Sequence, residues 1–306
     1  MARARILFLF PALFVLIWST GWIVAKYASP FVEPLSFLTV RYALAGLLLA
    51  AFCFAFKASW PGRQLMLHAV FSGVFLHAIY LGGIWWVLDR QMPSTLSGMM
   101  AALQPLMTAF LAGTIVGEQI SRRQWLGFAI GFGGLMIALT PRLAADLADT
   151  VGAEASWTLL IGINFISMIS VVIGTFYQKK YLQTGDLRTI TTLQYLGAFL
   201  ATLPAALLLE NFEFSWTPQL FGALAWSVLG LSLGAIGLLV ILIREGEVSR
   251  AAVLIYLIPP TIAVQAYFLF GERLSMSELA GMLLTVYGVY LVSVKRRTKS
   301  TEGLSG

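Results

Sequence analysis

Charged residues are scarce in this chain. Only 11% of its 306 residues are Asp, Glu, Lys or Arg, whereas 59% are hydrophobic. Soluble domains carry about 25% charged residues, so this sequence has too few to cover a soluble body. Together with the mean hydropathy of +0.84, its long apolar runs predict helices that cross a lipid bilayer.

Cysteine and histidine are also rare. The single cysteine, Cys53, excludes an intrachain disulfide, and the two histidines and scattered carboxylates form no metal-ligand cluster. There is no Walker A motif or glycine-rich phosphate loop, and no Ser/His/Asp set falls at membrane depth. We therefore expect no metal, no cofactor and no enzymatic activity.

The second half of the sequence repeats the first at a constant shift. The 154 residues that separate Lys26 from Lys180 (180 minus 26) also separate Pro105 from Pro259. Each copy holds five apolar runs, and an odd number of spans forces the second copy to enter the bilayer upside down. The expected fold is an all-α polytopic membrane protein, with ten transmembrane helices in two inverted five-helix repeats around a central cavity. Secondary transporters recurrently use this plan.

The expected spans follow the apolar runs. They are 6–26, 35–56, 65–87, 93–116, 124–141, 156–178, 189–209, 217–242, 248–270 and 278–295. The expected organisation is a first repeat at 1–142, an outer linker at 143–155, a second repeat at 156–297 and a disordered tail at 298–306.

Lys and Arg concentrate in alternate connections, which predicts the orientation. With both termini in the cytoplasm, the inner connections carry most of them, including Arg3, Arg63, Lys179, Lys180 and Arg296. The net charge of +6 then follows from topology and requires no nucleic-acid partner. The expected partners are a small-molecule substrate and the lipid bilayer, with the chain a monomer or weak homodimer.

Several motifs resemble a known family. The stretch Trp18–Trp22, the run Leu103-Gln104-Pro105 and its second-copy match Ile258-Pro259-Pro260, and the pairs Gly117-Glu118 and Gly271-Glu272 resemble the EamA branch of the drug/metabolite transporter superfamily. The resemblance covers essentially the whole chain. It implies a cavity built from helices 1, 3, 4, 6, 8 and 9, and the export or exchange of small metabolites, with amino-acid exporters the nearest characterised type.

The expected function is therefore export of amino acids or related amphipathic compounds from the cytoplasm, across a bacterial inner membrane. Alternating access would operate by facilitated diffusion or exchange. The alternative is a broad-specificity drug or organic-cation exporter driven by a proton gradient. Such carriers commonly hold a carboxylate in the membrane, and none of the 14 acidic residues sits at mid-bilayer, which favours the first reading.

Proline interrupts matching helices in the two copies. Pro105, Pro259 and Pro260 are predicted as hinges, because proline removes a backbone donor and kinks a helix. A kink that serves packing alone is the other interpretation.

Polar and aromatic residues inside spans are the candidate binding residues. Gln104 either bonds the carbonyls of its own kink or meets substrate, Asn164 either faces the cavity or bridges helices, and His77 is either structural or a proton carrier. The tryptophans either line the cavity or fill the bundle. The predicted substrate-binding set is Trp18, Trp22, His77, Tyr80, Met100, Gln104, Asn164, Met168 and Tyr256.

Charged residues lie at several helix ends, and each has more than one possible role. Glu272 is expected to pair with the nearby Arg273, and Lys26 to extend to the lipid headgroups. Arg41, expected near the outer end of its span, either attracts anionic groups or extends to the headgroups. Glycines four residues apart in helix 5, Gly127 and Gly131, allow close packing within the bundle or a dimer seam.

Overall fold

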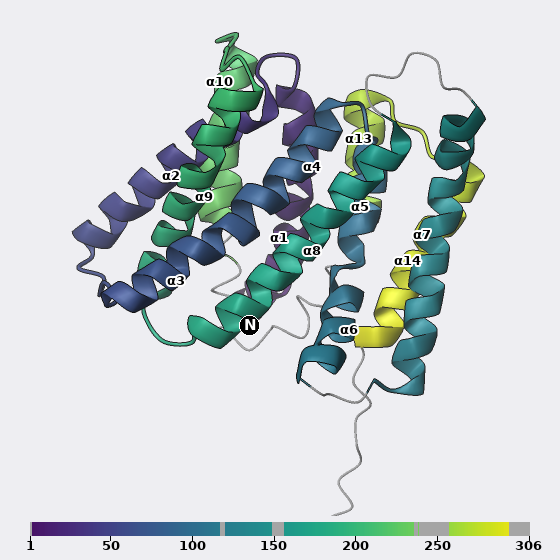
Figure 1. The fold of residues 1–306 in the computed structure, drawn as a ribbon, viewed down its shortest axis with the longest axis horizontal. Coiled ribbons are helices and arrows are strands. Elements are labelled where there is room, and N and C mark those ends of the chain that lie inside the picture. The colour runs from purple at the N-terminus through teal and green to yellow at the C-terminus, as the bar shows by residue number, and fades with distance from the viewer. Residues whose placement is uncertain (1, 117–119, 149–155, 236–237, 239–256, 294–306) are drawn as a thin grey trace, which may run out of the picture.

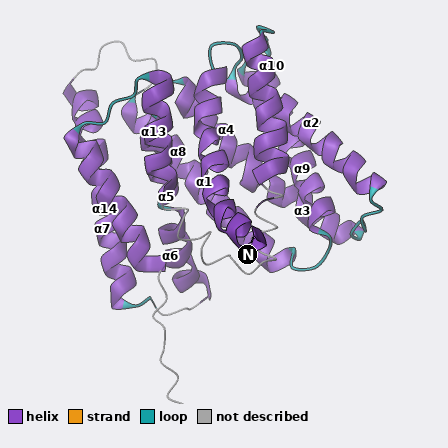
Figure 2. Cartoon of the chain, turned by 180° about the vertical axis from the view of Figure 1, so that it is seen from behind, coloured by secondary structure: helices purple, strands orange, loops and turns teal. Residues whose placement is uncertain are grey.

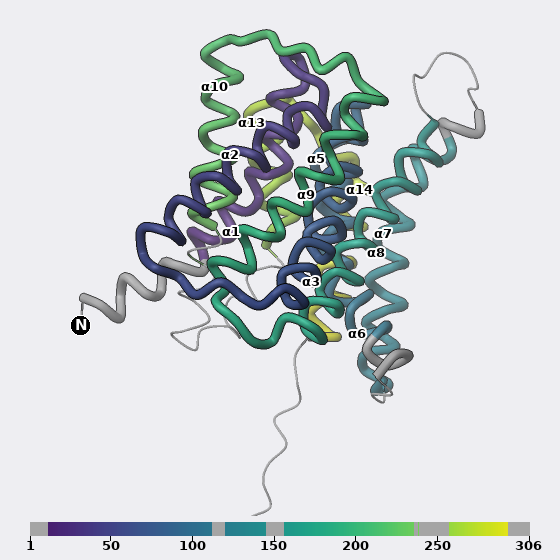
Figure 3. Tube along the Cα trace, turned by 60° about the vertical axis from the view of Figure 1, so that its left-hand side comes forward, coloured from purple at the N-terminus to yellow at the C-terminus, as the bar shows by residue number. Residues whose placement is uncertain are grey.

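A computed structural model describes residues 2–116, 120–148, 156–235, 238 and 257–293. The described part is helical, and its strand-like pairing is limited to a β-bridge between Val32 and Phe214 (Figure 2). The connections gather at the two ends of the bundle (Figure 3). The elements are α1 (Ala2–Ala28), α2 (Pro34–Ala55), α3 (Arg63–Gly73), η1 (Val74–Ile79), α4 (Tyr80–Asp89), α5 (Ser94–Ala102), α6 (Gln104–Val116), α7 (Arg122–Ala148), α8 (Trp157–Tyr181), α9 (Leu187–Leu209), α10 (Pro218–Ala225), η2 (Trp226–Ala235), α13 (Ile258–Phe270) and α14 (Met276–Ser293).

The predicted spans correspond to these helices wherever the chain is described. In the expected spans 217–242 and 248–270, residues 236–237, 239–242 and 248–256 lie outside the described residues. Six helical stretches of the described chain are long and apolar enough to cross a membrane, and the stretch Arg63–Asp89 is one of them, running through α3, η1 and α4. The chain is an all-α polytopic membrane protein. One expected span, 93–116, is divided into α5 and α6.

Helices related by the repeat pack against each other in opposite directions. Glu210, which follows α9, accepts hydrogen bonds from the first residues of α2, and Cys53 near the end of α2 meets Thr192 near the start of α9. Glu272, which follows α13, does the same for the first residues of α5. In the repeat, α2 matches α9, and α5 and α13 belong to the matching spans 93–116 and 248–270. The two copies are therefore inverted about a pseudo-twofold axis.

The pair α7 and α14 completes the pattern at one edge of the bundle (Figure 1). A Cβ added to Gly134 would lie 2.7 Å from the Gly281 carbonyl oxygen, and one added to Gly288 would lie 2.4 Å from the Gly131 nitrogen. The two backbones therefore touch, as small residues allow in membrane bundles. The glycines noted in the sequence serve packing within one chain.

Two π-helical segments occupy matching positions of the third helix in each copy. Segment η1 covers 74–79, and the repeat shift places it inside η2 at 226–235. Other helices bond its backbone: Tyr42 Oη donates to the His77 carbonyl at 3.0 Å, and Ser170 Oγ donates to the Phe75 carbonyl at 2.9 Å. In lipid such carbonyls need partners within the protein, and π segments are frequent at functional sites.

The α7–α14 contact predicts a difference between adjacent glycines. Gly134→Ala forces its methyl group into the backbone of α14, whereas a Cβ at Gly133 meets nothing within 4 Å. We expect Gly134→Ala to destabilise the protein by about 1–3 kcal/mol, the usual cost of overpacking, and Gly133→Ala to be near neutral. Thermal unfolding in detergent, followed by tryptophan fluorescence, measures both. Equal melting temperatures for the two variants would contradict this packing.

Candidate functional site

A cavity of about 440 Å³ lies between the two copies. Its lining comes from α1, α2, η1, α4, α6, α8, α9 and η2, so both repeats contribute. Three pairs of lining residues are repeat counterparts: Arg41 with Tyr195, His77 with Leu231, and Gly21 with Thr175. The pseudo-twofold axis therefore passes through the cavity, where transporters of this plan hold substrate.

Aromatic rings form much of the wall. Trp18, Trp22, Tyr80 and Trp85 line it, and the His77 and Tyr195 rings stack 4.8 Å apart. Amides and hydroxyls of Gln104, Gln178, Gln194, Thr175 and Thr191 add polar points. None of the described residues that line the cavity is an Asp or Glu. Such a mostly apolar cavity with a few polar groups suits an amphipathic small molecule.

The structure places five of the predicted binding residues on this cavity: Trp18, Trp22, His77, Tyr80 and Gln104. Three others, Met100, Asn164 and Met168, are buried away from it, at 1% exposure or less. Tyr256 lies outside the described residues.

Asn164 bridges helices. Its Oδ1 accepts from Ser97 Oγ at 3.0 Å, its Nδ2 lies 2.9 Å from Met100 Sδ, and the same Ser97 Oγ accepts from Trp22 Nε1 at 3.0 Å. This chain of bonds joins α1, α5 and α8 and fixes the Trp22 ring at the cavity wall. The helix-bridging interpretation of Asn164 accounts for these contacts.

The prolines stand at helix starts. Pro105 is the second residue of α6 and Pro259 the second residue of α13, and the repeat shift places the start of α6 on the start of α13. Proline is suited to a first helical turn because no helical partner exists there for its missing N–H. Pro105 thus follows a break between α5 and α6 rather than a kink in one helix, and Gln104, at that break, faces the cavity. Pro260 follows in the first turn of α13.

One end of the bundle is tightly closed; we call it the Lys26 end. Lys26 Nζ lies 2.7 Å from Glu272 Oε1, and the same carboxylate accepts from the backbone nitrogens of Ser94 and Thr95. A carboxylate at a helix start is favoured by the free N–H groups there. The expectation that Lys26 extends to the headgroups and Glu272 pairs with Arg273 is wrong, because the fold brings α1, α5 and α13 to one point. Beneath this point, the Phe37 and Trp85 rings stack at 4.6 Å.

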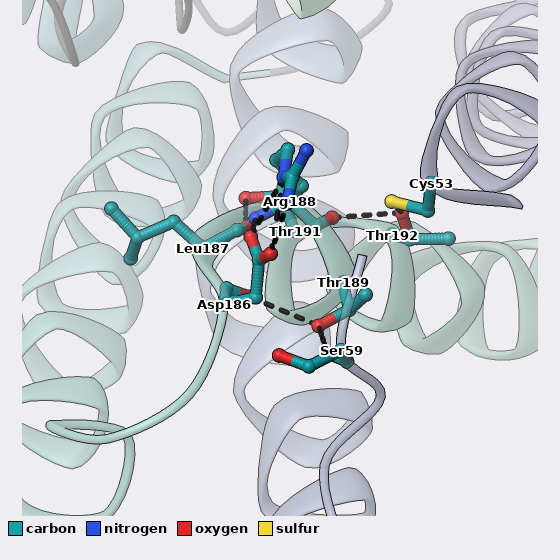
Figure 4. A network of polar contacts seen from close by, with 8 residues as sticks. All are labelled: Cys53, Ser59, Asp186, Leu187, Arg188, Thr189, Thr191 and Thr192. Carbon is teal, nitrogen blue, oxygen red and sulfur yellow. Dashed lines mark hydrogen bonds and ion pairs between the residues drawn. The ribbon is translucent and has the colours of Figure 1, made fainter. Parts of the chain in front are cut away.

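At the opposite end, which we call the Arg188 end, the cavity reaches the surface. The lining residues that are exposed, Thr175 and Leu187, lie where α8 ends and α9 begins. Figure 4 shows how the start of α9 is anchored there. Asp186 accepts from the Arg188 backbone and side chain, and Thr189 Oγ1 donates to the Ser59 carbonyl at 3.0 Å.

The position of Arg41 differs from the position predicted from the sequence. It was expected near the mouth, yet its side chain is 5% exposed and lines the cavity. The signal was present, since an ionisable residue inside a span marks a functional site by default.

The comparisons with known proteins agree with this architecture. The model of the EamA-like transporter family matches residues 5–140 and 156–294. The chain belongs to this family. The two EamA matches correspond to the two copies seen in the sequence, and the chain is accordingly a multi-pass membrane transporter.

Several bacterial transporters are about one quarter identical to this chain in sequence. The uncharacterized transporter YvbV of Bacillus subtilis is 25% identical over 96% of this chain and 93% of its own. The uncharacterized inner membrane transporter YedA of Escherichia coli K12 is 26% identical over 95% and 92%. A probable amino-acid metabolite efflux pump of Salmonella typhimurium is 24% identical over 96% and 97%. A solved crystal structure, 13% identical, superimposes with a TM-score of 0.61 over 93% of this chain and 96% of that one, which supports the fold.

Substitutions of Gln104 and Asn164 are expected to have different effects, one on substrate affinity and the other on stability. Asn164→Ala leaves buried partners unsatisfied and is expected to lower stability by about 1–3 kcal/mol. Because Ser97 still accepts from Trp22, the remaining folded protein is expected to keep most of its substrate affinity. Gln104→Ala removes a cavity amide and is expected to weaken substrate affinity about three- to tenfold with little change in melting temperature. Thermal unfolding and transport kinetics on both variants test this. The assignment is wrong if Gln104→Ala leaves the kinetics unchanged.

Proposed function

We propose that the chain exports amino acids or related amphipathic metabolites from the cytoplasm by alternating access, without catalysing a chemical reaction. The observation that carries this is the aromatic-walled cavity on the pseudo-twofold axis, shared by both copies and reaching one surface. The Salmonella relative, named a probable amino-acid metabolite efflux pump, supports the substrate class. Trp18, Trp22, His77, Tyr80 and Gln104 are the proposed substrate contacts.

The proposed orientation follows the charges. The Arg188 end carries Arg63, Lys179 and Lys180 beside Arg188, and basic residues favour the cytoplasm. The structure then corresponds to an inward-facing state in a bacterial inner membrane, and both termini face the cytoplasm. The Lys26 end is the outer gate.

Motion between the two states is proposed to occur at Pro105, Pro259 and Pro260. Discontinuous helices at matching positions of inverted repeats are where transporters of this plan bind and rearrange. Facilitated diffusion or exchange is favoured over proton coupling, because His77 has no carboxylate beside it among the described lining residues to continue a proton path.

Transport in liposomes tests the function. Purified protein is reconstituted, and uptake and counterflow of labelled amino acids are measured with and without a pH gradient. We expect saturable counterflow that needs no pH gradient. Liposomes without the protein are the control and are expected to show no counterflow. Saturable transport of organic cations without any amino-acid transport would favour the drug-exporter alternative. Accumulation driven by the pH gradient, abolished in His77→Ala, would overturn the passive mechanism.

The outer gate makes a separate prediction. Glu272→Gln removes the anion that holds Lys26 and the start of α5, so α5 loses a charge-assisted cap. We expect amide hydrogen exchange over residues 94–98 to become about fivefold faster and the rate of counterflow to change. Glu213→Gln is the matched control, because Glu213 is an exposed carboxylate in the loop between α9 and α10. The gate is wrongly assigned if the two variants exchange at the same rate.

A further inference from the structure

Arg41 is a buried cation facing the cavity. It lies two turns into α2, about 10 Å from the start of the helix, and is 5% exposed. Its Nε donates to Ser232 Oγ of η2 at 3.2 Å. His77 of η1 and Tyr195 of α9 line the cavity together with Arg41, and their rings stack 4.8 Å apart. It is thus held by both repeats at the wall of the cavity.

No described carboxylate neutralises this charge. The ion pairs within the described residues are Lys26–Glu272, Arg90–Asp89, Arg142–Glu278 and Arg188–Asp186, and none includes Arg41. A buried charge without a partner is costly. The bond to Ser232 uses Nε, and no described residue accepts from the two terminal nitrogens. Those nitrogens offer parallel donors that match the two oxygens of a carboxylate.

The cavity wall around Arg41 restricts the rest of a ligand whose anionic group binds there. The stacked His77 and Tyr195 rings and the Trp18, Trp22 and Trp85 walls favour an apolar or aromatic body. The described lining offers no carboxylate to an ammonium group. The cavity therefore offers paired donors for an anionic end and an apolar wall for a hydrophobic end.

We propose that Arg41 is the anion-binding residue of the cavity, and that the recognised ligand is an amphipathic monocarboxylate. The carboxylate is required for binding, whereas the α-amino group of an amino acid is dispensable. The assignment rests on the proposed transport function and deepens it: 2-oxo, 2-hydroxy and unsubstituted aromatic acids join amino acids as substrates.

A binding series tests the assignment without relying on transport. Quenching of tryptophan fluorescence in detergent is measured with 3-phenylpropionate, phenylalanine, phenylalanine amide and 2-phenylethylamine. We expect the two carboxylates to bind with similar affinity, and the amide and amine to bind at least about tenfold more weakly. Equal affinity for the amine and the acids would overturn the proposal. Competition by phosphate or chloride as strong as that by 3-phenylpropionate would also overturn it, by showing a general anion site.

Variants locate the effect at Arg41. Arg41→Gln is expected to abolish the preference for acid over amine, and Arg41→Lys, which keeps the charge but loses the paired donors, to retain part of it. Arg63→Gln is the control, because Arg63 is exposed at the start of α3. If Arg41→Gln unfolds, the ligand series on the unaltered protein still decides the question. Unchanged preference in folded Arg41→Gln contradicts the proposal.

Counterflow of the same probes separates this proposal from the general function. Carboxylates that bind but are not moved would contradict transport and leave the Arg41 assignment intact. Amino acids that are moved equally well by Arg41→Gln would leave transport intact and refute the role of Arg41.

Discussion

Backbone irregularities at η1 and at the starts of α2 and α5 are matched by hydrogen-bond partners from elsewhere in the bundle. Lipid offers no donors or acceptors, so a membrane helix can change pitch, stop or restart only where the protein itself supplies them. Tyr42 and Ser170 supply them at η1. Glu210 and Glu272 supply them at the starts of α2 and α5. Each partner comes from a different helix, which ties the positions of the helices to one another.

Close helix packing and irregular backbone are found in different parts of the bundle. The pair α7 and α14 is in backbone contact through glycine and has little freedom to slide. The irregular segments η1, η2 and the α5–α6 break lie instead around the cavity, where lining residues from both copies meet. Rigid packing at the edge and irregular backbone at the centre suit a protein in which the centre must rearrange.

Much of the fold could be predicted from the sequence, because apolar length and the constant repeat shift are local or periodic signals. The inverted pairing followed from an odd number of spans, and the cavity residues Trp18, Trp22, His77, Tyr80 and Gln104 from their depth in a span. The π segments could not be predicted, since η1 and η2 have ordinary helical composition. Which of two polar residues meets a cavity also depends on helix rotation. Asn164 turned toward Ser97 and Met100, while Arg41 turned inward.

The two copies are alike in path but differ where they face the cavity. Arg41 and His77 of one copy stand opposite Tyr195 and Leu231 of the other. If the two halves were identical, the inward-facing and outward-facing conformations would be related by the twofold axis and would have the same energy inside a symmetric bilayer. Under the proposed alternating access, this mismatch makes the two conformations unequal in energy, and the unequal side chains are ones that line the cavity. In that proposed mechanism, a bound ligand shifts the balance between the two conformations, because it contacts the residues that make them unequal.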